Sequence, residues 1–313
     1  GLIPLFIHSI FLFKMNLTTF RKLYKLSSSN FFTFTNPKVL KNGKVSNVPT
    51  AVLMLKPSEN ACAGMGSCSK LCLNTAGVPF YLENKLACRD RRDKAINNDT
   101  QAFYNMLLVE LFRFYSKHRE YKNLSARLNG VSDYAFEKKY IDKMQTLTST
   151  VYVTQETQKE VKKKFNISIK AGKNNILKAI LTAIDDDINK PISDKLALYD
   201  YTKRLGSGIP AIDRDIKACK ALNYHLTPSH GSRYDTFLAA IELGLNYAAA
   251  FDLKKSEKLP EYIIYRNKKL HVIDADISDY RIQDPSDKTY ICGLRIKRTP
   301  NQTESQRKAF CIG

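Results

Sequence analysis

The chain has 313 residues, 43% of them hydrophobic, and a formal net charge of +20 from 50 Lys and Arg against 30 Asp and Glu. This apolar content supplies a core and excludes a mostly disordered chain, and the length allows one large domain or two small ones. The charge favours anionic partners such as nucleic acid or nucleotides, although a codon bias that enriches Lys, Asn and Ile would raise it without any binding role.

The start of the chain does not match a targeting segment. The first Met is Met15, and the apolar residues 1–13 lack the basic flank of a signal peptide and are shorter than the ~20 residues of a membrane span. We expect residues 1–45 to be a disordered or non-native arm, in which 1–14 are translated upstream sequence. A flexible arm and a cleaved leader are the alternatives. We expect no membrane partner.

The rest of the chain, residues 46–313, is predicted to be a single α/β domain. An apolar run at 51–55 indicates the first strand, and helices are expected at 82–96 and from Asp99 or Thr100 onward. Further strands are expected at 124–128, 196–199, 224–227, 246–251 and 290–297, with a hairpin formed by 262–265 and 270–273.

Short strands that alternate with helices predict a parallel sheet covered on both faces, either open or closed. We expect a βα-repeat fold like a TIM barrel, complete or partial, with the C-terminal β-hairpin. Residues 143–192 interrupt the alternation with a basic segment, 159–164, and an amphipathic helix, 174–188. We interpret them as a helical insertion on the outside of the barrel, with the basic segment as a solvated face.

Polar side chains crowd the ends of the expected strands. Because the carboxyl ends of parallel strands meet at one edge, Asp133, Asp200, His230, Asp252 and Asp274 are expected to converge there. From this edge we predict four catalytic or substrate-holding residues, namely Asp133, Asp200, Lys203 and His230. For His230 a packed core histidine is an equal alternative.

Asp274 and Asp276, with Asp279 nearby, could bind a cation or cofactor. Capping of a turn is the default interpretation of such closely spaced carboxylates, because Asp in turns commonly bonds to its own backbone.

Three of the seven cysteines, Cys62, Cys68 and Cys72, lie within eleven residues. Seven cysteines do not suggest a disulfide framework, so a reducing cytoplasm fits the chain better. Clustered thiolates bind soft or borderline metals, and glycines between the cysteines let the backbone turn tightly. Three donors leave a fourth position for a substrate, a cofactor, water, Cys88 or His230. Unligated buried or redox thiols are the alternative.

Several sequence blocks resemble the gene product 88 family of phage proteins, whose function is not established. They are Cys62–Cys72 followed by Arg89–Arg92, then Ala126–Asp133, Leu198–Lys203, Asn223–Thr227, Val272–Arg281 and Gly293–Lys297. The resemblance implies a phage-type protein in the cytoplasm of a host cell. It implies no activity.

More distantly, a cysteine triad after the first strand of a βα-repeat domain resembles the radical SAM enzymes. That resemblance implies a four-iron four-sulfur cluster on the three cysteines, with S-adenosylmethionine at the open iron. The spacing differs, being five and three intervening residues here and three and two there. The family's glycine-glycine-glutamate strand is missing, and its nearest stand-in is Asn129–Asp133, which makes Asn129 and Ser132 candidate cofactor-binding residues.

Two hypotheses follow. The first is a phage-encoded metalloenzyme with an iron–sulfur cluster on the cysteines and its substrate on the polar edge. The second is a nucleic-acid-binding protein in which zinc only holds the cysteine loop, while Arg89, Arg91, Arg92 and the Lys-rich insertion contact phosphates.

Overall fold

The structure is a computed structural model that describes residues 15–34, 37–59, 61–72, 79–136, 151–174, 176–188, 195–206, 208–232, 235–298 and 302–312. The helices are α1 (Leu17–Tyr24), α2 (Ser28–Phe31), α3 (Pro37–Ser46), α4 (Pro79–Asn98), α5 (Thr100–Lys117), α6 (Gln155–Phe165), α7 (Ile176–Ile188), α8 (Ile209–Lys220), α9 (Phe237–Glu242) and α10 (Glu304–Phe310), with 3₁₀ turns η1 (Ser67–Leu71) and η4 (Arg281–Gln283). The strands are β1 (Thr50–Val52), β2 (Leu124–Arg127), β3 (Val151–Val153), β4 (Gly172–Asn174), β5 (Leu196–Thr202), β6 (Tyr224–Pro228), β7 (Tyr247–Phe251), β8 (Tyr262–Tyr265), β9 (Lys268–Asp274) and β10 (Tyr290–Arg295).

Two four-stranded sheets make up one curled, mostly parallel half-barrel. The first has the order β1-β2-β5-β6 with every pair parallel, and the second has the order β7-β10-β9-β8. A parallel bridge between Ser229 and Ala248 connects β6 to β7. The strands therefore follow one another around a curl, and the carboxyl ends of all of them except β8 face the same way.

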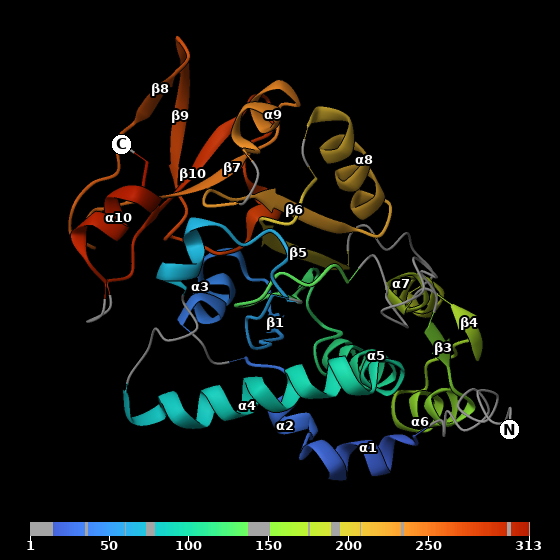
Figure 1. The fold of residues 1–313 in the computed structure, drawn as a ribbon. Helices are drawn as coiled ribbons and strands as arrows, with labels where there is room; N and C mark the ends of the chain where they lie inside the picture. Colours follow the sequence, from blue (N-terminus) through green and yellow to red (C-terminus); the bar gives the residue numbers. More distant parts are fainter. Residues whose placement is uncertain are drawn as a thin grey trace, which may run out of the picture.

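The expected strands are confirmed, and so is the hairpin, since β8 and β9 pair antiparallel around Asn267. A TIM barrel is not confirmed. Strand β10 inserts between β7 and β9, and β8 runs against them at the edge, so β1 and β8 do not pair within the described residues. The hairpin projects away from the other strands instead (Figure 1).

The first sheet shares a buried hydrophobic cluster with α5. This helix is apolar nearly all round, and Phe103, Leu107 and Leu111 are fully buried in one cluster with Leu124 of β2 and Leu198 of β5. A helix without a polar face has to be enclosed on every side. Accordingly α1, α4, α6 and α7 lie around α5 (Figure 1).

The segment for which we expect a disordered arm instead forms α1, α2 and α3 from Met15 onward; residues 1–14 lie outside the described part. Asn16 caps α1 by accepting a hydrogen bond from the backbone N–H of Thr19 at 2.8 Å. Phe20 and Phe31 are fully buried in the cluster around α5. Disorder was expected because this segment is rich in Ser and Asn and contains few apolar residues.

The residues of the expected insertion form β3, α6, β4 and α7; residues 137–150 and 189–194 lie outside the described part. The basic segment occupies α6, and its lysines Lys159, Lys162, Lys163 and Lys164 are all exposed. On the opposite side, Val161 and Phe165 are buried. The expected amphipathic helix corresponds to α7.

Candidate functional site

The cysteine loop, residues 61–72, follows β1 and ends in η1. The backbone N–H of Cys62 donates to the Ser58 carbonyl at 2.8 Å, and that of Met65 donates to the Cys62 carbonyl at 2.9 Å. All seven cysteines are free, and Cys62, Cys68 and Cys72 are half-buried. The loop thus offers three reduced thiols within one turn-rich segment.

This loop packs directly on the segments that follow β2, β5 and β6. The backbone N–H of Asp133 donates to the Ala61 carbonyl at 2.8 Å, and Met65 forms an antiparallel bridge with Ser232. A Cβ atom at Gly64 would lie 1.7 Å from the carbonyl oxygen of Lys203, so only glycine allows this approach. The loop therefore covers the carboxyl ends of three neighbouring strands.

The Cys62 thiol is strongly affected by its surroundings. Burial, followed by the charges of Asp133 and Cys72, raises the pKa of Cys62 to about 12. Cys62 is therefore a neutral thiol at pH 7. In the described part of the chain, no three His, Cys, Asp or Glu side chains are arranged so that they could hold a metal ion.

Asp133 is the centre of the polar network under the loop. Its Oδ2 accepts hydrogen bonds from the backbone N–H of Lys203 at 2.6 Å and from the Thr202 hydroxyl at 3.2 Å. Its Oδ1 lies 3.2 Å from the Arg204 guanidinium. The Lys203 ammonium in turn donates to the Ser229 hydroxyl at 2.9 Å. One guanidinium, one hydroxyl and one backbone N–H thus meet the Asp133 carboxylate next to the cysteines, and the Lys203 ammonium binds Ser229.

His230 borders this network. Its backbone N–H donates to the Ala248 carbonyl at 2.8 Å, and its ring centroid lies 6.4 Å from that of Tyr247 and 6.2 Å from that of Phe310. Burial, followed by the charge of Lys203, lowers the pKa of His230, while Asp235 raises it. The ring is therefore a neutral imidazole at neutral pH.

Three other predicted site residues, Asn129, Ser132 and Asp200, make hydrogen bonds within the fold. The side-chain oxygen of Asn129 accepts hydrogen bonds from the Ser132 hydroxyl at 3.0 Å and the Tyr134 backbone N–H at 2.7 Å. Asp200 is fully buried and accepts hydrogen bonds from the Asn129 backbone N–H at 3.0 Å and from the Tyr224 hydroxyl at 2.6 Å. These contacts occupy the Asn129 amide oxygen, the Ser132 hydroxyl and the Asp200 carboxylate.

Burial raises the pKa of Asp200 to about 6, and Arg127 opposes this shift. Arg127 lies 3.4 Å from Asp200 and 2.6 Å from Asp279. Asp200 is therefore ionised at pH 7 and paired with a cation under the sheet edge.

Asp274 and Asp276 lie at the end of β9. Both pair with Arg295 of β10, at 3.0 and 3.1 Å, and the backbone N–H of Asp276 donates to Asp274 Oδ1 at 3.0 Å. Asp252 pairs with Arg298 and Arg307 at 2.8 and 3.2 Å. The structure therefore gives the carboxylates of the second sheet arginine partners and brings only Asp133, Lys203 and His230 of the predicted set beside the cysteine loop.

The two candidates for a fourth thiol or imidazole ligand have other surroundings. The Cys88 thiol donates to the Asn30 carbonyl at 3.8 Å, and the His230 ring lies against those of Tyr247 and Phe310. Arg92, proposed above as a phosphate contact, is buried and bonds to the carbonyl oxygens of Asn30 and Met54. Arg89 is also buried. The hypothesis that α4 presents these two arginines to nucleic acid is wrong.

Sequence reasoning missed three residues of the site. Arg204 and Ser229 directly follow β5 and β6, so their position after a strand was the available signal. Gly64 was noted only for its freedom to turn. No local pattern shows that its missing side chain admits the Lys203 carbonyl, because the contact joins residues far apart in sequence.

Comparison with known proteins gives one family. The model of the gene product 88 family matches residues 27–155, which include the cysteine loop and Asn129–Asp133. This confirms the resemblance to that family of phage proteins for this part of the chain. Neither the curated proteins nor the solved structures contain a match, so the more distant resemblance to radical SAM enzymes has no support. Among the described helices, none is both long and apolar enough to cross a membrane.

Proposed function

We propose that this relative of the gene product 88 proteins is an enzyme that holds a thiophilic metal group, an iron–sulfur cluster, on Cys62, Cys68 and Cys72. The observation that carries the proposal is that the cysteine loop packs on the segments at the carboxyl ends of β2, β5 and β6. Ligands of parallel α/β folds bind at that edge. A loop that only joined β1 to α4 would not need three thiols there.

The donor set fits such a group in its chemistry. Three thiols suit soft and borderline metals, and three donors leave one position open to a substrate or cofactor. The described side chains do not form a closed site by themselves, so binding would draw the thiols together. With a pKa of about 12, Cys62 would also have to release a proton to the solvent as the cation replaced it. When bound, the cluster would supply an electron or an open coordination position.

The chain's own residues would hold the substrate beside it. The Lys203 ammonium uses one donor for Ser229 and is half-buried, so its other donors can bind a carboxylate or phosphate. The neutral imidazole of His230, bordering the same network, can accept a proton at a ring nitrogen. Asp133 would act as a positioning residue, since it orients both the Lys203 backbone and the Arg204 guanidinium. We therefore expect an anionic substrate.

Anaerobic purification tests this proposal. We expect a brown protein that contains iron and acid-labile sulfide, directly or after reconstitution, with an electron paramagnetic resonance signal on reduction. Replacing Cys62, Cys68 or Cys72 with Ser should each abolish the colour. The matched control is Cys311→Ser, because Cys311 is also half-buried but its charged neighbours are Asp252, Arg307 and Arg298.

The competing results are distinct. If the protein contains stoichiometric zinc and no iron, and the same three variants lose the zinc, then the loop is stabilised by zinc and does not hold a cluster. A protein that binds neither iron nor zinc after reconstitution would leave only unligated thiols and would refute the proposal.

A further inference from the structure

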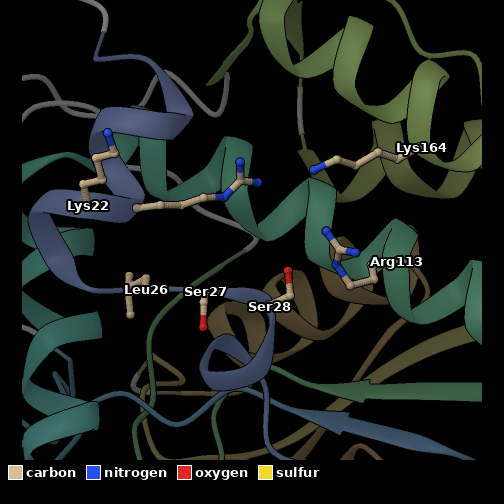
Figure 2. Close-up of a pocket in the computed structure, with 7 residues that line it drawn as sticks. Lys22, Leu26, Ser27, Ser28, Arg113 and Lys164 are labelled. Carbon is tan, nitrogen blue, oxygen red and sulfur yellow. The ribbon is translucent and has the colours of Figure 1, made fainter.

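A shallow hollow of about 390 Å³ lies among α1, α2, α5 and α6 (Figure 2). It is lined by Arg21, Lys22, Leu26, Ser27, Ser28, Arg113 and Lys164. Four of these seven side chains are cations, and a single one is apolar. Helix α10 contacts η1 of the cysteine loop, and Figure 1 shows α6 and α10 on different sides of the fold. The hollow is therefore a second candidate site, independent of the cysteine loop.

The nearby carboxylates neutralise only part of this charge. Glu160 lies 2.9 Å from Arg21 and 2.7 Å from Lys164. Glu110 lies 3.0 Å from Arg113 and accepts a hydrogen bond from the Ser28 hydroxyl at 3.1 Å. Two carboxylates thus face four cations. Lys22 has no ion-pair partner within the described part of the chain.

Arg113 is held in a conformation that suits a phosphate. Its Nε binds Glu110, which is almost completely buried, and its guanidinium carbon lies 5.5 Å from the centre of the Phe165 ring. Both contacts leave the two terminal nitrogens for another ligand, and this fork matches two phosphate oxygens. In Figure 2 the polar ends of Arg113, Lys164 and Ser28 turn toward the same open space.

The positive surface continues beyond the hollow along α6. Lys159, Lys162 and Lys163 are exposed, while the two glutamates of the helix are used to dock α1: Glu156 accepts a hydrogen bond from the Leu17 backbone N–H at 3.1 Å, and Glu160 binds Arg21. The acidic residues of this face are therefore engaged in packing. An elongated cationic surface attracts a polyanion more strongly than it attracts a single small anion.

We propose that the hollow and the exposed lysines of α6 bind the sugar–phosphate backbone of a nucleic acid. The shallow shape suits a strand that crosses the surface rather than an enclosed small molecule. Among the described residues no aromatic side chain lines the hollow, so base stacking is not expected there. Binding should depend on phosphate contacts and hardly on base sequence.

Titration of the full chain with fluorescein-labelled single-stranded and duplex oligonucleotides tests the site. The informative variant is Lys22→Gln with Lys164→Gln, because both lysines are exposed and Glu160 keeps Arg21 as its partner. The control is Lys255→Gln with Lys258→Gln, which removes the same charge from exposed residues between β7 and β8. We expect weaker binding in the first variant alone, with the slope of log affinity against log salt reduced by about two.

A second variant separates geometry from charge. Arg113→Lys keeps the net charge but loses the fork, so binding should weaken although circular dichroism is unchanged. Equal losses in the two double variants would show a diffuse charge effect and overturn the proposal. Salt-independent binding, or no oligonucleotide binding by the unmodified chain, would overturn it too. Binding only to phosphatidylserine vesicles would assign the surface to lipid headgroups instead.

Discussion

Arg204 and Asp133 form an ion pair of 3.2 Å in which both side chains are almost fully buried, with 7% and 10% of their surfaces exposed. The pair joins the segments after β2 and β5 directly under the cysteine loop. The same carboxylate accepts the backbone N–H of Lys203. One buried charge therefore holds two strand ends in register beneath the thiols.

Replacing Asp133 with Ala should cost roughly 3–5 kcal/mol of unfolding free energy, because it removes the carboxylate that faces the buried Arg204 guanidinium and accepts from the Thr202 hydroxyl and the Lys203 backbone N–H. Chemical denaturation measures this loss. The control is Asp213→Ala, which removes an exposed pair with Lys217 and should cost less than about 1 kcal/mol. Equal losses in the two variants would contradict a structural role for the buried pair.

Cys62 should react slowly with iodoacetamide in the metal-free protein. Its pKa of about 12, against an ordinary value of 9.0, predicts about a thousandfold less thiolate than an unfolded cysteine at pH 8.5. Mass spectrometry of the tryptic peptide gives the rate, and the same peptide in denaturant is the reference. Similar rates in the folded and denatured chains would show that the thiol is not buried as described.

Gly64 and Gly43 provide a matched pair. Gly64→Ala would place a Cβ atom 1.7 Å from the Lys203 carbonyl, so we expect the cysteine loop to be displaced, with a loss of about 1–3 kcal/mol or more. Gly43 lies within α3 with nothing within 4 Å of an added Cβ, so Gly43→Ala should stabilise the helix by up to about 1 kcal/mol. Thermal unfolding of both variants should therefore shift in opposite directions.

His230 should make the protein less stable as the pH falls. Its folded-state pKa lies below the ordinary 6.5, so its contribution to stability is complete above pH 6.5 and is lost as the pH falls through the folded value. Asp200 acts in the opposite sense in this window, because its pKa is raised to about 6.

The difference between the unmodified chain and His230→Gln isolates the histidine. Denaturation at pH 7.5 and 5.5 should show the unmodified chain losing more stability on acidification than the variant. If both chains lose the same amount, then His230 is exposed to solvent in the folded state.

The strands were predictable because each is a short apolar run, and such a run can be recognised from the local sequence alone. Leu124–Arg127 and Tyr247–Phe251, for example, lie within a residue of their expected bounds. The three N-terminal helices were not predictable. Phe20 and Phe31 are isolated apolar residues in a polar segment, and they are buried because they pack in the cluster around α5, which is distant in sequence.

The candidate site also has a part that was predictable from the sequence and a part that was not. Position after a strand correctly brought Asp133, Lys203 and His230 together, because parallel strands share a carboxyl edge. For Asp274 and Asp276 a turn cap was the default interpretation, and the Asp276 backbone N–H does donate to Asp274; the pairing of both carboxylates with Arg295, about twenty residues later in the chain, was not predicted. The pairing of each arginine with a carboxylate depends on the order of the strands in the sheet, and a local sequence pattern does not reveal that order.

The position of β10 between β7 and β9 bears on how the chain folds during synthesis. Both neighbours precede it in the sequence, so after their translation they expose unpaired backbone edges until residues 290–295 leave the ribosome. The second sheet therefore forms by insertion of a late strand, a non-local step that is slow compared with hairpin or helix formation. Until that step β7 is paired only on the side that faces β6, through contacts that include Ser229 and His230 with Ala248, so the half-formed sheet is exposed to aggregation and to chaperone binding.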